Sequence, residues 1–116
     1  MIADDSDAVR MVLKDILVIG RHECVAEAAN GVEAIEQFKK TEPELMLLDM
    51  AMPKKDGLEV LKEIMIHKPS AKIIMITASD SQVTIKECIS VGATAYILKP
   101  FNFEDVLNNI AKVLDS

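Results

Sequence analysis

The stretch LMLLDMAMPKKDGLEVLKEI, residues 45–64, decides how this chain folds. It opens with four apolar residues that do not alternate with polar ones, a pattern typical of a strand buried on both faces of a parallel sheet. Asp49 ends this run, and the turn residues Pro53 and Gly57 indicate a loop. Apolar residues then recur at helical spacing over residues 58–65. The stretch therefore predicts one strand–loop–helix unit of an α/β fold.

The same unit recurs on both sides of this stretch. Short apolar runs that predict strands alternate with amphipathic segments that predict helices. The predicted strands are Ile2–Ala3, Cys24–Ala28, Leu45–Leu48, Ile73–Ile76 and Ala95–Leu98, and the predicted helices cover residues 7–19, 32–40, 58–65, 83–89 and 106–113. We therefore predict a parallel sheet with helices on both of its faces.

Composition excludes several classes of protein. The 116 residues carry a net charge of −6, which argues against a nucleic-acid-binding surface. Half of the residues are hydrophobic, enough for one compact domain over residues 1–116, but the apolar runs are too short to cross a bilayer. Acidic residues near the start do not suit a secretory signal, and the two isolated cysteines favour a reducing compartment. We expect a cytoplasmic protein.

Polar side chains follow the predicted strands at the point where each strand ends. Asp4 and Asp5 follow the first strand, and Asp49 follows the third. Thr77 follows the fourth strand, and Lys99 follows the fifth. Parallel strands present their carboxyl ends at one edge of the sheet, where ligands of open α/β folds bind. We therefore expect these five side chains to lie close together.

Three carboxylates at one edge of a sheet repel one another unless a cation lies between them. Mg²⁺ suits such a site, because it binds a few carboxylates and carbonyls and retains water. A divalent cation beside a nucleophilic Asp and a Lys also favours phosphoryl transfer, since both cations offset the charge on the transferring group. The alternative is that Asp4 and Asp5 only stabilise the start of the following helix through its dipole. That alternative does not explain why Asp49, Thr77 and Lys99 also lie at strand ends.

These residues resemble the response-regulator receiver family, in particular its single-domain, CheY-like chemotaxis regulators. The motifs that carry the resemblance span essentially the whole chain: IADDS at 2–6, LLDMAMP at 47–53, ITA at 76–78 and KPF at 99–101. The resemblance implies a doubly wound, five-stranded parallel sheet with the flavodoxin-like strand order 2-1-3-4-5. It also implies a cis peptide bond before Pro100, and a signalling switch rather than an enzyme.

In that strand order the first strand is central, so its shortness would leave backbone groups of both neighbouring strands unpaired. Three explanations are open. The strand starts further upstream, a short strand from Ile2 to Asp4 suffices, or strands are exchanged between chains.

The resemblance also implies a role for each acidic residue. Asp49 would accept a phosphoryl group from a histidine kinase in a reaction that needs Mg²⁺. Asp5, Asp49 and the backbone carbonyl of Ala51 would bind the metal directly. Asp4 would act mainly through metal-bound water.

The remaining residues would contact the phosphoryl group and report its arrival. Lys99 would pair with the phosphoryl group, and the Thr77 hydroxyl would donate a hydrogen bond to another of its oxygens. Tyr96 would be a switch aromatic that turns inward when Thr77 moves, although an ordinary strand aromatic is the alternative. The fourth helix, last strand and fifth helix, including Lys86 and Phe103, would form the face that binds a downstream protein effector.

Other functions are weighed against this one. A receiver domain excised from a multidomain regulator, such as a transcription factor, fits the same residues. An aspartyl phosphatase of the dehalogenase type would need a second Asp where Ala51 stands. A flavin-binding module would need a phosphate loop where Asp4 and Asp5 stand. We expect no contact with nucleic acid or membrane through this domain, and either a monomer or a phosphorylation-dependent dimer.

Overall fold

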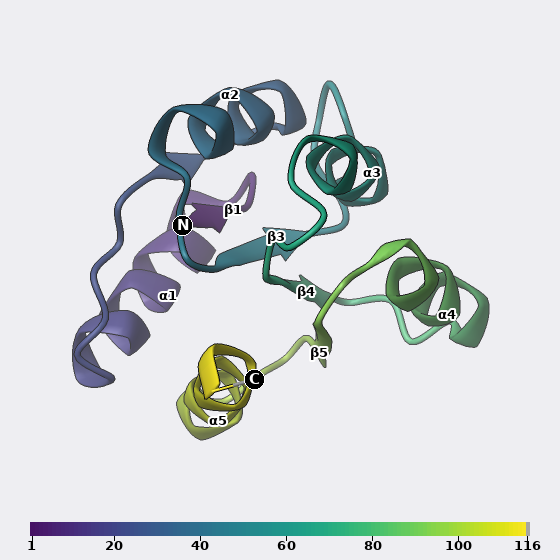
Figure 1. The fold of residues 1–116 in the computed structure, drawn as a ribbon. Helices are drawn as coiled ribbons and strands as arrows, with labels where there is room; N and C mark the ends of the chain where they lie inside the picture. Colours follow the sequence, from purple (N-terminus) through teal and green to yellow (C-terminus); the bar gives the residue numbers. More distant parts are fainter. Residues whose placement is uncertain (116) are drawn as a thin grey trace.

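The computed structural model describes residues 1–115 (Figure 1). Within them the elements are β1 (Ile2–Ala3), α1 (Asp7–Ile19), β2 (Glu27–Ala28), α2 (Gly31–Thr41), β3 (Met46–Asp49), α3 (Gly57–His67), β4 (Ile73–Thr77), α4 (Gln82–Val91), β5 (Ala95–Leu98) and α5 (Phe103–Asp115). The strands pair in parallel in the order β2-β1-β3-β4-β5. The predicted fold class and strand order are confirmed.

Helices cover both faces of the sheet: α1 and α5 lie on one side, and α2, α3 and α4 lie on the other (Figure 1). Successive residues of a strand point to opposite faces. In β3, Leu47 packs toward α1 and α5, whereas Met46 and Leu48 pack among the residues under α2 and α3. In β4, Ile74 likewise packs toward α1 and α5, and Met75 packs on the opposite face. Both faces are buried, which explains why these strands are apolar without alternation.

The central strand β1 is only two residues long, yet backbone hydrogen bonds extend its pairing on both sides. The N–H of Ile2 donates to the carbonyl of Ala26 at 3.1 Å, and the N–H of Asp4 donates to that of Ala28 at 3.0 Å. On the other side, the N–H of Leu47 donates to the carbonyl of Met1 at 2.8 Å. Within this chain, the short strand therefore pairs with both of its neighbours.

The strand predicted at Cys24–Ala28 is wrong in its extent. Only Glu27 and Ala28 form β2, and they lie opposite Ile2 and Ala3. β2 is an edge strand whose single partner is β1, so the short partner limits its length.

Side-chain caps determine where four of the helices begin, close to the carboxyl ends of the strands. The caps are Ser6 on α1, Asn30 on α2, Asp56 on α3 and Ser81 on α4. Each accepts a hydrogen bond from a backbone N–H that the helix itself leaves unpaired. Among residues 1–115, no helix combines the length and the apolar character needed to cross a membrane.

Candidate functional site

Three carboxylates meet at the carboxyl edge of the sheet. Asp4 and Asp5 follow β1, and Asp49 is the last residue of the neighbouring strand β3. One oxygen of each carboxylate lies within 4.8 Å of the others. Asp4 and Asp49 are buried, with 1% and 5% of their surface exposed, whereas Asp5 is exposed to solvent. The structure therefore brings together the three acidic residues that the strand ends predicted.

Lys99 brings a positive charge to this cluster from the end of β5. Its Nζ donates a hydrogen bond to Oδ2 of Asp4 at 3.1 Å and lies 3.4 Å from Oδ1 of Asp49. Burial disfavours the ammonium form, but the contacts with these two carboxylates outweigh burial and raise the pKa of Lys99. Lys99 is therefore held in its charged form.

The fold disfavours ionisation of the Asp49 carboxyl group. Burial raises the pKa of Asp49, the neighbouring charge of Asp4 raises it further, and Lys99 only partly offsets both effects. Asp4 is better compensated, since its Oδ1 accepts the N–H of Ser6 at 2.9 Å while its Oδ2 accepts Lys99. One lysine does not neutralise three carboxylates.

Thr77 and Tyr96 are linked through the segment that follows β4. Thr77 is buried, and its backbone carbonyl accepts the N–H of Lys99 at 2.8 Å. Its Oγ1 accepts the N–H of Ser79 at 3.3 Å, and the hydroxyl of Tyr96 donates to the carbonyl of Ser79 at 2.9 Å. A displacement of residues 77–79 therefore acts directly on the side chain of Tyr96. The Lys99–Pro100 peptide bond is cis, as the resemblance implied.

The loop after Asp49 is fastened close to its start. Gly57 donates its N–H to the carbonyl of Met50 at 2.7 Å, and a Cβ on Gly57 would lie 2.3 Å from the carbonyl oxygen of Asp49. Such an approach leaves room only for glycine. Met52 is buried in the core, whereas the side chain of Ala51 is exposed.

Residues 1–111 match the family described as the response regulator receiver domain. The chain belongs to this family. The receiver domain is 43% identical over 115 residues to the chemotaxis protein CheY of Bacillus subtilis, which covers 99% of this chain and 96% of that protein. It is 40% identical to the CheY of Thermotoga maritima over 97% of this chain and 94% of that protein.

Solved structures agree with this assignment. The CheY in the CheX–CheY–BeF₃–Mg²⁺ complex of Borrelia burgdorferi superimposes with a TM-score of 0.94 at 33% identity, over 97% of this chain and 85% of that one. A CheY-like receiver domain of Methanospirillum hungatei gives a TM-score of 0.92 at 33% identity, over 98% and 90% of the two chains. The present chain is a CheY-like receiver domain, which is a signalling switch rather than an enzyme.

The residues of this receiver domain suit Mg²⁺. Three carboxylates supply hard oxygen donors, two of them are buried, and a single lysine leaves the cluster with an uncompensated negative charge. Burial and repulsion from Asp4 raise the pKa of Asp49, and a divalent cation held by Asp4, Asp5 and Asp49 would offset that repulsion. The acidic cluster therefore has the oxygen donors and the uncompensated charge that are typical of the Mg²⁺ site of a receiver domain.

The raised pKa of Asp49 predicts how the metal-free receiver domain responds to pH. The folded-state pKa lies above the ordinary value of 3.8, so the native state holds this proton more tightly than the unfolded state does. The unfolding free energy contributed by Asp49 therefore falls as pH rises from 3.8 through the raised pKa. Urea unfolding in a chelator should show Asp49→Asn gaining stability relative to the parent over this range. A gap between the two proteins that stays constant with pH would contradict the assignment.

Sequence reasoning missed Arg10, whose Nη1 donates to the backbone carbonyl of Asp4 at 2.6 Å. The guanidinium also pairs with Asp7 and Glu27, and thereby ties the start of α1 to β2 behind the acidic cluster. A charged residue on a surface helix is usually solvated, so only an arginine one to two turns after the Asp pair could have suggested this contact. The role of Gly57 was missed in the same way, because Asp56-Gly57 indicates only a turn and the start of a helix.

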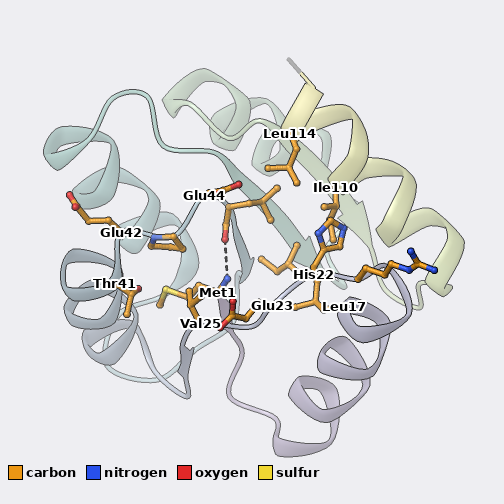
Figure 2. Close-up of a pocket in the computed structure, with 14 residues that line it drawn as sticks. Met1, Leu17, His22, Glu23, Val25, Thr41, Glu42, Glu44, Ile110 and Leu114 are labelled. Carbon is orange, nitrogen blue, oxygen red and sulfur yellow. Dashed lines mark hydrogen bonds between the residues drawn. The ribbon is translucent and has the colours of Figure 1, made fainter.

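A cavity of about 390 Å³ lies at the opposite edge of the sheet, away from the acidic cluster (Figure 2). Its walls include Leu17, Ile110 and Leu114, and the amino group of Met1 donates to the carbonyl of Leu45 beside it at 3.0 Å. His22 lines this cavity and therefore lies away from the acidic cluster.

Proposed function

We propose that this receiver domain is a stand-alone chemotaxis-type response regulator that a histidine kinase phosphorylates on Asp49. The observation that carries this proposal is the position of Asp49, a buried carboxylate that belongs to the acidic cluster and lies 3.4 Å from Nζ of Lys99. Asp4 is less suited to attack, because both of its oxygens accept hydrogen bonds. Asp5 is exposed, and we assign it to the Mg²⁺ site.

The reaction is a transfer between two side chains. A carboxylate oxygen of Asp49 attacks the phosphorus atom, an O–P bond forms, and the P–N bond to the imidazole of the kinase histidine breaks. Asp5, Asp49 and the backbone carbonyl of Ala51 would hold Mg²⁺, which would supply positive charge to offset that of the transferring group. The ammonium group of Lys99 pairs with one phosphoryl oxygen, and the hydroxyl of Thr77 donates to another.

The switch follows from the link between Thr77 and Tyr96. Movement of the Thr77 hydroxyl toward the phosphoryl group draws residues 77–79 with it and breaks the hydrogen bond from Tyr96 to Ser79. Tyr96 then turns inward and reshapes the face formed by α4, β5 and α5. Val83, Leu98 and Phe103 expose apolar surface on these elements, which suits a protein effector.

The chemotaxis output and a cytoplasmic location are parts of the same proposal. Support comes from the CheY relatives, of which the chain covers 94% to 96%, and from two free cysteines, which suit a reducing compartment.

A small acyl phosphate tests the proposal without the kinase. With Mg²⁺ present, we expect the protein to gain the mass of one phosphoryl group, and a chelator should prevent the gain. The chain holds one Tyr and no Trp, so its tyrosine fluorescence reports Tyr96 alone and should change together with the mass. Tyr96→Phe should be phosphorylated without a fluorescence signal. Absence of uptake at saturating donor and Mg²⁺ would overturn the proposed function.

A further inference from the structure

The loop that follows Asp49 is also held from outside its own strand–helix unit. Gly31, the first residue of α2, donates its N–H to the carbonyl of Pro53 at 3.2 Å. The same carbonyl accepts the N–H of Lys55 at 2.8 Å. From within the unit, the loop is fastened by the ion pair between Lys55 and Glu63 of α3. Gly31 is thus a brace that connects α2 to the middle of the loop.

The contact at Gly31 is too close for any side chain. A Cβ on Gly31 would lie 2.1 Å from the carbonyl oxygen of Lys55 and 2.7 Å from its carbonyl carbon, whereas ordinary contacts begin at 3.4 Å. The obstructing atoms are two backbone atoms and the Cβ of Lys55, none of which moves with a change of rotamer, so the clash is not relieved in that way. Either α2 or the loop has to move by roughly 1 Å.

The start of α2 is the less movable partner. Asn30 is 8% exposed and caps the helix by accepting the N–H of Glu33 at 2.9 Å. The carboxylate of Glu33 accepts in return from the side chain of Asn30 and from the N–H of Ala29, both at 3.1 Å. Further along the helix, Phe38 is fully buried in the core. A substitution at Gly31 therefore displaces the loop rather than the helix.

We propose that Gly31 is a positioning residue for the Mg²⁺ site. By bracing residues 50–56 it fixes the stretch of backbone that carries the carbonyl of Ala51. The inference rests on the proposed function, in which that carbonyl is a metal ligand. Mg²⁺ requires nearly ideal octahedral geometry, so a shift of roughly 1 Å in one ligand weakens binding. Gly31 acts on the metal through the loop and does not touch it.

Gly31→Ala should lower the affinity for Mg²⁺ by about 10-fold or more, the range known for residues that orient metal ligands. Calorimetric titration of the intact protein with MgCl₂ measures this change without any phosphorylation. Gly20→Ala is the matched control, since a Cβ on Gly20 would lie 2.4 Å from Cδ2 of Leu107, at the far end of α1 from the acidic cluster. We expect this control to lose stability but to keep the parent affinity.

The outcomes separate this inference from the proposed function. A parent chain that does not bind Mg²⁺ would overturn both. A parent that binds, together with a folded Gly31→Ala of equal affinity, would overturn only the role of Gly31.

A second measurement on the unsubstituted chain covers the case in which Gly31→Ala does not fold. In an NMR titration with MgCl₂, the amide signal of Gly31 should shift with the same midpoint as that of Ala51, while the amide of Gly20 stays in place. An unmoved Gly31 signal beside a shifting Ala51 signal would overturn the inference.

Discussion

Asp49→Asn is expected to abolish phosphoryl uptake from a small acyl phosphate, with a loss of at least ~10³-fold in rate. The amide that replaces the carboxylate has a similar shape but carries no charge and is a poor nucleophile. Phosphate incorporation measured by intact-protein mass spectrometry, with Mg²⁺ in excess, checks this result.

Asp15→Asn is the matched control for this variant. It makes the same chemical change at an exposed position of α1, outside the acidic cluster, and should leave uptake at the parent level. Uptake that persists in Asp49→Asn would assign the acceptor to another carboxylate. Loss of uptake in both variants would point to a general charge effect rather than to Asp49.

Unfolding does not offer a second explanation for the loss in Asp49→Asn. Burial and the charge of Asp4 make an ionised Asp49 unfavourable in the metal-free fold, so the neutral amide relieves repulsion. The variant should therefore unfold at no lower urea concentration than the parent at neutral pH. An inactive but stable protein is the expected combination.

Asp5→Asn is expected to weaken Mg²⁺ binding by about 100-fold, because it removes one of the charged oxygen donors from a hard-cation site. The effect should be large although Asp5 is exposed, since Asp4 is already engaged with Lys99 and Ser6. Calorimetric titration with MgCl₂ gives the affinity directly. Phosphoryl uptake should then need a correspondingly higher Mg²⁺ concentration.

Asp7→Asn separates metal ligation from the general attraction of a negative surface. It removes the same charge only two residues further along, where the side chain is 92% exposed and pairs with Arg10. A loss of affinity below about 3-fold is expected there, because exposed charges are screened by solvent and salt. Equal losses in Asp5→Asn and Asp7→Asn would contradict a direct role for Asp5.

Much of the architecture could be predicted before any coordinates, because its signals are local. Unbroken apolar runs such as Leu45–Leu48 and Ile73–Ile76 predicted buried strands, and both are confirmed within one residue. The strand predicted at Cys24–Ala28 was too long, because the extent of the edge strand β2 depends on its partner β1. The pairing order came from the resemblance of the motifs to a known family, since hydrophobic periodicity does not state which strands are neighbours.

The sequence by itself determined which side chains reach the functional edge. Parallel strands of one sheet end at the same edge, and the residue that follows each apolar run is visible in the sequence. Only the tertiary structure decided what those side chains do to one another. Lys99 and Asp4 are 95 positions apart, yet they form the hydrogen bond that keeps Lys99 charged. Burial of Asp49 and the brace from Gly31 to Pro53 likewise depend on how whole units pack. Contacts between residues so far apart in the sequence produce no periodic pattern, because only the packing of the folded chain brings the partners together.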